Sequence, residues 1–551
     1  MHSGIMCTMY QPELKNCPIC ADKLIKKYNT AKKTVITLKE KMECGERVLK
    51  CRNGNCKGSL MSFHSAEFRA LSLEDMTFGI DVVALEGELR FEEHKTIEEI
   101  VNILKVQGVN TNGATVSKHL DKYLALVSGY QEQKLKDIQQ AIVKKGGYVL
   151  QIDGTVSTKT KTLYIFRDNI SGTTLYAALA NHDDTNSVKP LFQDIKNKFG
   201  VPLAIMSDMQ KAFIESAADV FTGVPHQFCQ YHFLKNVGNA ILKEKHQQLG
   251  TLIRDKEVKN KIERVQNQVE IKKKNDKLAE VIFSFCCLLL GVTTMQAPFE
   301  LYYVEIYKRY WEVRTAIRKC IKMCSLELEY LRVLFELDEL LSSVVTDESI
   351  KMLVNELKDY YHYFRRLCDI LTDVKDKGKM VREEVEKKAR RFLTEMKTKS
   401  RNHPEFKKIV TRLEKYWNGL FYTYEFYYIP STNNELEGYI KDFKRVWKRI
   451  TGFYNVNRWI SFHGPFAVYM FNFRKNVDGQ SPFELLGLDT STINVIFREV
   501  SIETFRNERV KQMELRETYR LRLKVNQIGA KEYLGSLVMT FENEIENIKR
   551  S

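Results

Sequence analysis

Hydrophobic and polar positions follow two different patterns along this chain, and the change of pattern predicts its organisation. Between residues 146 and 235, short β-rich apolar runs alternate with turn signals and helical stretches, which is typical of an α/β sheet. These runs are Tyr148–Ile152, Leu163–Phe166, Thr174–Leu179 and Leu203–Met206. From 240 to 420, Leu, Glu, Lys and Arg recur at helical spacing with very little Pro, which predicts an all-helical block. Residues 426–475 return to a strand, turn and helix pattern.

The pattern as a whole predicts a multidomain α+β protein. We expect an N-terminal zinc ribbon, a helix-turn-helix, an α/β core interrupted by a large all-α insertion, and a polar, mostly helical tail. The expected segments are 1–66 for the zinc ribbon, 67–130 for the helix-turn-helix, 145–242 and 426–475 for the two parts of the core, 243–425 for the insertion and 476–551 for the tail.

Charge and composition narrow the class of protein. The chain has 551 residues, of which 44% are hydrophobic, and its formal net charge is +16. Such a charge attracts polyanions, above all nucleic acid, although a merely soluble basic protein is the alternative. The longest apolar run, around Val281–Val292, is too short to span a bilayer, so we expect no membrane partner. The 12 cysteines are too sparse for a disulfide scaffold, and we expect an intracellular protein.

Four N-terminal cysteines form a candidate metal site. Cys17 and Cys20 frame a CxxC loop, Cys51 and Cys56 frame a wider second loop, and a strand-like run, Thr34–Leu38, lies between the pairs. Two short chelating loops separated by a β segment suit a structural four-thiolate Zn²⁺ site. Cys44 could replace one ligand, and unrelated free thiols are the alternative interpretation.

Residues 96–124 have the length and break of a helix-turn-helix. Thr96 and Glu99 form a capping box, Gly108 permits a turn, and a second helix is expected from about Asn112 to Leu124. Its outward residues include Lys118 and Lys122, which are candidates for DNA contacts. Any helical hairpin could show the same pattern, so the zinc ribbon and the basic charge are what favour DNA.

Three carboxylates are candidate ligands for catalytic metal ions. Asp153 and Asp208 each end a strand-like run, where a carboxylate would be held rigidly while facing solvent. Glu437 comes much later, after Thr432 and Glu435, which we expect to be the N-cap and capping-box partner of a helix. Glu437 lies two residues further, roughly 200° round that helix, and should point elsewhere. Two divalent cations held by such oxygens would catalyse phosphoryl transfer.

A basic stripe follows Glu437 on the same predicted helical face, where it could track a DNA backbone. A solvated charged face is the alternative. The stripe consists of Lys441, Lys444, Arg445, Lys448 and Arg449.

Several of these motifs together resemble those of the Mutator-like element transposases and their bacterial insertion-sequence relatives. The resemblance rests on Ser207–Phe213, on His226–Asn236 with its CxxH pair Cys229 and His232, and on Asn433–Gly438, and it spans roughly residues 146–475. It implies an RNase H-like core and a DDE triad of Asp153, Asp208 and Glu437. Cys229 and His232 could hold zinc, but no second pair lies nearby in the sequence, so a structural or DNA-contact role is favoured.

The resemblance also implies an activity. We expect Mg²⁺- or Mn²⁺-dependent cleavage and strand transfer on double-stranded DNA, at terminal inverted repeats and target DNA, by a homodimer or higher oligomer in a prokaryotic, nucleoid-associated setting. The alternatives are a domesticated, catalytically inactive DNA-binding protein and an RNase H-like nuclease without strand transfer. All three acids are present, which disfavours the inactive form.

Overall fold

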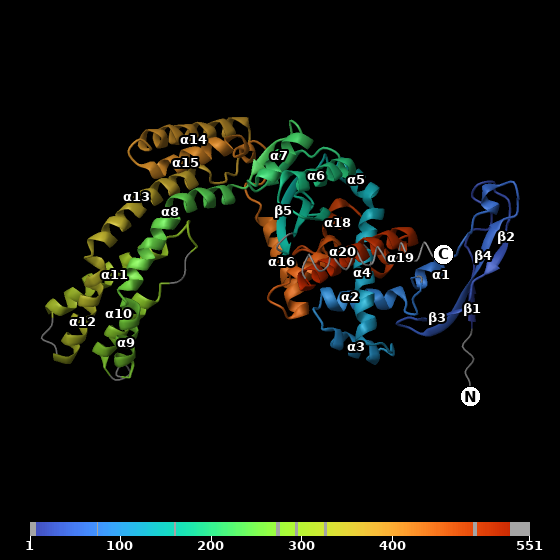
Figure 1. Ribbon diagram of the computed structural model, residues 1–551, viewed down its shortest axis with the longest axis horizontal. Helices are drawn as coiled ribbons and strands as arrows, with labels where there is room; N and C mark the ends of the chain where they lie inside the picture. Colours follow the sequence, from blue (N-terminus) through green and yellow to red (C-terminus); the bar gives the residue numbers. More distant parts are fainter. Residues whose placement is uncertain are drawn as a thin grey trace. The chain divides into compact units, whose positions relative to one another are not determined.

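The computed structural model describes residues 7–73, 75–158, 161–271, 276–292, 296–323, 328–488 and 493–528 (Figure 1). The chain divides into two compact units. The first contains the described residues up to Ile205, Lys211–Val224 and those from Asn434 onward, and the second contains Met206–Gln210 and Pro225–Asn433. Among the described residues, no helix has the length and apolarity that crossing a bilayer requires.

The first unit begins with a four-stranded sheet built around one long strand, β4 (Lys41–Cys51). β4 pairs in parallel with β1 (Cys7–Tyr10) and antiparallel with β2 (Leu24–Asn29) and β3 (Lys33–Ile36). The strand expected at Thr34–Leu38 is therefore present as β3. Cys44 lies on β4, where its Sγ donates to the carbonyl of Lys33 at 3.7 Å.

Five helices follow: α1 (Ala66–Leu71), α2 (Ile80–Phe91), α3 (Ile97–Val106), α4 (Gly113–Gln133) and α5 (Leu135–Lys144). The predicted capping box opens α3, with Thr96 and Glu99 bonding each other's backbone amides. Gly108 adopts φ 82°, a left-handed conformation that favours glycine, in the turn before α4. Asn112 caps α4, which runs nine residues beyond the predicted end at Leu124, because its second half is buried.

A five-stranded sheet has the order β7-β6-β5-β8-β9, and the chain passes from the first unit to the second within β8. Pairing of β5 with β6 and of β6 with β7 is antiparallel. The strands are β5 (Val149–Thr158), β6 (Lys161–Asp168), β7 (Thr174–Ala180), β8 (Ala204–Ser207) and β9 (His226–Phe228), and the first four match the predicted runs. Helices α6 (Thr185–Phe199) and α7 (Lys211–Val220) follow β7 and β8, and Phe192 of α6 packs edge-on against Phe166 of β6.

From Asn434 onward, the described residues of the first unit form helices and no strand. The helices are α16 (Asn434–Thr451), α17 (Asn457–Ala467), the 3-10 helix η4 (Val468–Asn472), α18 (Pro482–Leu486), α19 (Ile493–Glu499) and α20 (Ile502–Ile528). The strand expected within 426–475 is thus wrong for the described chain. Buried residues of α2, α4, the sheet, α16 and α17 form one continuous hydrophobic core, so these elements hold one another in place.

The second unit is a helical array, as the spacing of apolar residues predicts. Its helices are α8 (Gln230–Asp255), α9 (Val258–Glu270), α10 (Lys277–Leu290), α11 (Tyr302–Met323), α12 (Leu328–Val345), α13 (Glu348–Ile370), α14 (Lys379–Lys399) and α15 (Pro404–Tyr416). Neighbouring helices pack in pairs, α8 with α13, α9 with α10 and α11 with α12.

Candidate functional site

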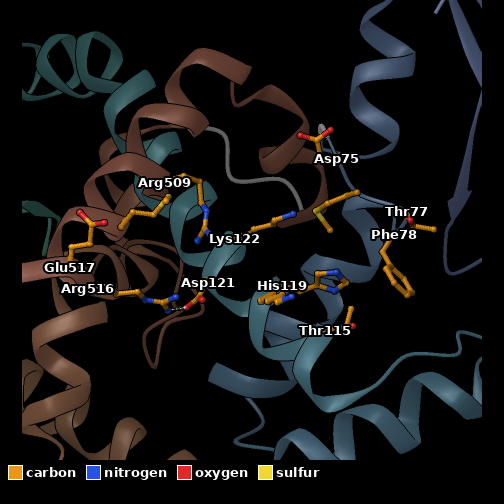
Figure 2. A pocket seen from close by; sticks show the side chains of 13 residues that line it. Asp75, Thr77, Phe78, Thr115, His119, Asp121, Lys122, Arg509, Arg516 and Glu517 are labelled. Carbon is orange, nitrogen blue, oxygen red and sulfur yellow. Dashed lines mark hydrogen bonds and ion pairs between the residues drawn. The ribbon is translucent and has the colours of Figure 1, made fainter. Parts of the chain in front are cut away.

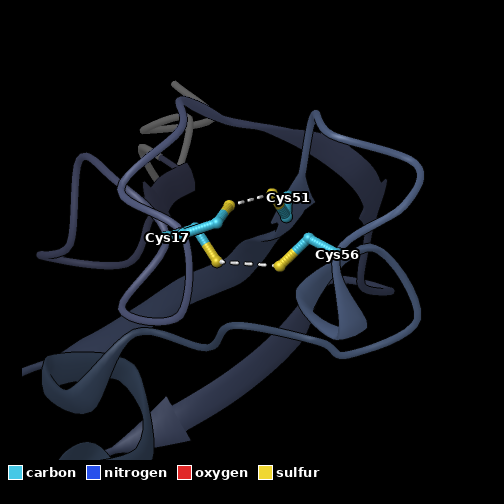
Figure 3. A group of neighbouring side chains, drawn as sticks. Cys17, Cys51 and Cys56 are labelled. Carbon is cyan, nitrogen blue, oxygen red and sulfur yellow. Dashed lines mark hydrogen bonds between the residues drawn. The ribbon is translucent and has the colours of Figure 1, made fainter.

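The four predicted cysteines meet at one point of the N-terminal sheet (Figure 3). The Sγ atoms of Cys17 and Cys56 lie 3.9 Å apart, those of Cys20 and Cys51 lie 3.4 Å apart, and all four lie within 4.8 Å of one another. Sulfurs bound tetrahedrally to zinc at about 2.3 Å would be about 3.8 Å apart. Four cysteines in this arrangement could bind a metal such as zinc, and Cys44 is not one of them.

The thiols of this cluster differ in pKa. Burial raises the pKa of Cys17, but hydrogen bonds with the backbone amides of Ile19 and Cys20 and with the Cys51 and Cys20 thiols together lower that pKa to about 7. Burial, followed by the neighbouring Cys20 thiol, raises the pKa of Cys51 to about 12. The 3-10 helix η1 (Lys57–Ser59) closes the second loop, and the amide of Gly58 donates to Cys56 Sγ at 3.3 Å.

Asp153 lies in the middle of β5 and not at its end, so the expected strand-end position is wrong for this residue. It pairs in register with Ile165 of β6, and β5 continues to Thr158 because this pairing extends past the predicted run. The Asp153 side chain is half-buried and its Oδ1 accepts from the amide of Gly154 at 2.7 Å.

Asp208 directly follows β8, as predicted. Its Oδ1 accepts from the amide of Gln210 at 2.9 Å, which fixes the turn. Behind it, Ser207 Oγ donates to the Asp208 carbonyl and lies 2.7 Å from Nε2 of His226. Burial lowers the pKa of His226 to about 3, so this imidazole is neutral at pH 7 and acts as a hydrogen-bonding support.

Glu437 occupies the first turn of α16, and the predicted stripe follows it. Lys441, Arg445, Lys448 and Arg449 are exposed and Lys444 is half-buried, while the opposite face is buried in the core. The helix begins at Asn434, so the expected N-cap role of Thr432 and capping role of Glu435 are both wrong. Glu435 is exposed, and Oε2 of Glu435 lies 3.7 Å from Nη1 of Arg167.

One lysine of the stripe links α16 to the sheet. α16 packs against β5, and Lys444 lies close enough to Asp153 for the two charges to interact. Burial lowers the pKa of Lys444, and Asp153 opposes that effect. Glu437 lies two helical turns before Lys444 on the same face of α16.

The CxxH pair opens the long helix α8. Cys229 is fully buried, its amide donates to the Ser207 carbonyl at 2.9 Å, and its Sγ accepts from the amide of Asn433 at 3.3 Å. These bonds hold the chain next to Asp208. His232 lies in the first turn of the same helix.

Sequence reasoning missed the partners of Lys118 and Lys122. Lys118 is exposed and Lys122 half-buried, and both line a pocket between α4 and α20 that Arg509 and Arg516 also line (Figure 2). Arg509 and Arg516 are seven residues apart in the tail, which is predicted to be mostly helical, so they would share one helical face. This spacing is the sequence signal that could have indicated a basic face there.

Comparison with protein families identifies the central part of the chain. Residues 89–291 match the family described as "Transposase, Mutator family". This part of the chain is similar to a Mutator-family transposase domain. The match supports a Mutator-like transposase, with DNA binding and DNA-cleaving and transfer activity in general. Asp153, Asp208, Cys229 and His232 lie inside the matched residues, whereas Glu437 and the cysteine cluster lie outside them. No curated protein matches the chain.

Proposed function

We propose that this Mutator-like transposase is a DDE enzyme that cleaves the inverted-repeat ends of an insertion sequence and joins them to target DNA. Asp153, Asp208 and Glu437 are the proposed ligands of two Mg²⁺ or Mn²⁺ ions. The observation that carries the proposal is the sheet order, since it makes β5, which bears Asp153, the neighbour of β8, which Asp208 follows. This order, with its antiparallel β5, β6 and β7, also supports an RNase H-like core.

The position of α16 supports Glu437 as the third ligand. α16 packs on β5, Lys444 of α16 lies near Asp153, and Glu437 shares a helical face with Lys444. Carboxylate oxygens are hard ligands suited to Mg²⁺. Bound metal ions would activate the attacking oxygen and stabilise the leaving oxygen of the phosphodiester.

The other residues of the proposal bind and position DNA. Lys441, Arg445, Lys448 and Arg449 present exposed cations along α16, and each phosphate they neutralise releases counterions. Lys118 and Lys122 are proposed to contact phosphates from α4, the second helix of the predicted helix-turn-helix. Two DNA ends must be held together for transfer, so the proposed active form is a homodimer or higher oligomer.

Carboxylate substitutions test this proposal. Asp153→Asn, Asp208→Asn and Glu437→Gln should each reduce Mg²⁺-dependent cleavage of inverted-repeat DNA by more than the roughly 10–100-fold typical of residues that merely support a metal ligand. Glu435→Gln is the matched control, because Glu435 is an exposed glutamate on the same turn of α16. Full activity of all three triad variants would refute the assignment.

A second assay separates the alternatives. With precut ends, a transposase joins the ends to target DNA, whereas a nuclease of this fold only hydrolyses. A domesticated protein would bind the ends and show neither reaction. The presence of all three acids disfavours this alternative.

A further inference from the structure

The C-terminal helix α20 forms a pocket with the second helix of the predicted helix-turn-helix. α20 packs along α4, and the cavity between them has a volume of about 540 Å³ (Figure 2). Lys118 and Lys122 enter it from α4, and Arg509 and Arg516 enter it from α20. The helices are fixed to each other beside the pocket by Gln512, whose Nε2 donates to the Asp121 carbonyl at 3.0 Å.

The four cations of this pocket differ in whether a carboxylate neutralises them. Arg516 donates to Oδ1 of Asp121 at 2.5 Å, so these two charges neutralise each other. Arg509 hydrogen-bonds only the neutral Gln512 side chain, at 2.6 Å, within the part of the chain that the structure describes. In the same described residues, neither Lys118 nor Lys122 forms an ion pair within 4 Å.

Arg509 and Lys122 repel each other in a half-buried setting. Burial lowers the pKa of Lys122, the charge of Arg509 lowers it further, and exposed Asp75 compensates only in part. Burial also lowers the pKa of Arg509, the charge of Asp121 opposes this effect, and the charge of Arg516 adds to it. Asp75, Asp121 and Glu517 also line the pocket, so its four Lys and Arg side chains face three carboxylates and one positive charge is left without a counter-charge. An anion that enters between Lys122 and Arg509 would supply it.

We infer that this pocket receives a phosphate group of the DNA backbone, with Lys122 and Arg509 as its charged contacts. The guanidinium fork of arginine binds phosphate oxygens bidentately, and lysine adds a point charge. The volume admits more than a single phosphate, as a sugar-phosphate segment requires. Thr115 and Lys118 extend the pocket lining toward the N-terminal half of α4, the part of a second helix that lies nearest DNA in a helix-turn-helix.

The inference rests on the proposed function, because that function makes DNA the ligand. It also gives α20 a role in DNA binding. The salt dependence of DNA binding tests it. With the full-length chain and a short duplex, Lys122→Gln and Arg509→Gln should each reduce the slope of log affinity against log salt by about one unit. Lys144→Gln, which removes an exposed lysine of α5 outside the pocket, should leave the slope unchanged.

Thermal unfolding without DNA separates binding from structure. Because each substitution relieves repulsion, both variants should melt at or above the wild-type temperature, whereas a structural role predicts lower melting temperatures. Inorganic phosphate serves as the probe for a free anion. A salt slope that is unchanged in the variants overturns the inference. This holds even if inorganic phosphate stabilises the wild type but not the Lys122→Gln, Arg509→Gln double variant, because the pocket would then bind a free anion and not DNA.

Failure of this inference is distinguishable from failure of the proposed function. Asp153→Asn should lose cleavage and keep the wild-type salt slope. If Asp153→Asn behaves so and the pocket variants also keep the slope, only the pocket assignment falls. If Asp153→Asn cleaves normally, the catalytic assignment falls whatever the pocket variants do.

Discussion

The imidazole of His463 stacks on the indole of Trp447, with ring centroids 5.4 Å apart and 13° between the ring planes. His463 lies on α17 and Trp447 on α16, the helix that carries Glu437. Trp459 extends the stack, and Nδ1 of His463 lies 3.7 Å from Asp121 of α4. The stack therefore joins α16, the helix of the proposed third acid, to α17, and the contact between His463 and Asp121 joins both helices to α4.

Acid should destabilise this stack. Burial lowers the pKa of His463 from 6.5 to about 4, so folding stability from this residue is present above pH 6.5 and is lost progressively as pH falls toward 4. The loss amounts to roughly 3 kcal/mol at pH 4. His463→Phe keeps a stacked ring without a titrating group and should flatten the dependence. Urea unfolding followed by tryptophan fluorescence measures the free energy of unfolding at pH 7 and pH 4.5. If the wild type and His463→Phe lose equal stability between these pH values, the explanation is refuted.

A methyl group at residue 58 should damage the thiolate cluster. A Cβ added to Gly58 would lie 2.7 Å from Cys17 Sγ, whereas one added to Gly54 would meet nothing within 4 Å. Gly58→Ala should therefore lower zinc affinity by about tenfold or more, the scale typical of changes around metal ligands. Gly54→Ala is the matched control, and zinc content after dialysis against a graded chelator is the measurement. Equal zinc retention in the two variants would show that the sulfurs do not hold metal in this arrangement.

Zinc binding should weaken as pH falls. Cys51 has a pKa of about 12, and that of Cys56 is also raised, so both thiols are protonated at pH 7 before metal binds. Metal must displace at least these two protons, which predicts a loss of about 100-fold in affinity per pH unit near neutrality. Competition with a chelating dye between pH 6 and 8 measures the slope. A slope of log zinc affinity against pH below one, which means that less than one proton is released per bound zinc ion, would contradict the four-thiolate site.

Removing the charge of Lys444 should change the metal requirement. The Lys444 cation lies near Asp153 and would compete with a metal ion at the proposed site for that carboxylate. Lys444→Gln should therefore lower the Mg²⁺ concentration needed for half-maximal cleavage by about fivefold, which corresponds to about 1 kcal/mol of Coulomb energy. Lys441→Gln removes an exposed cation of the same helix and should not lower that concentration. A higher Mg²⁺ requirement in Lys444→Gln would indicate that Lys444 assists the metal site.

Local signals in the sequence were sufficient for much of the fold. The apolar runs locate β5 to β8, and Thr96 with Glu99 marks the start of α3, because both signals depend on residues close together in the chain. Positions set by distant pairing were missed. β5 extends past Asp153 because β6 pairs with it, although Gly154 favours an end to the strand.

The N-cap of α16 was predicted one residue too early because two neighbouring residues are both suited to that position. Thr432 and Asn433 are both good N-caps, and the helix begins one residue later than the Thr432 cap implies. The contact of α20 with α4 joins residues nearly 400 positions apart, as the Gln512 to Asp121 hydrogen bond shows, and periodicity carries no information on such a pairing. The pocket that includes Arg509 could therefore be found only from the structure.

Anomalous scattering from Mn²⁺ bound to the full-length chain in crystals tests the catalytic assignment most directly. The account predicts two manganese peaks about 3.5–4 Å apart, contacted by carboxylate oxygens of Asp153, Asp208 and Glu437. Manganese bound without Glu437, or held by Glu435 in its place, would contradict it.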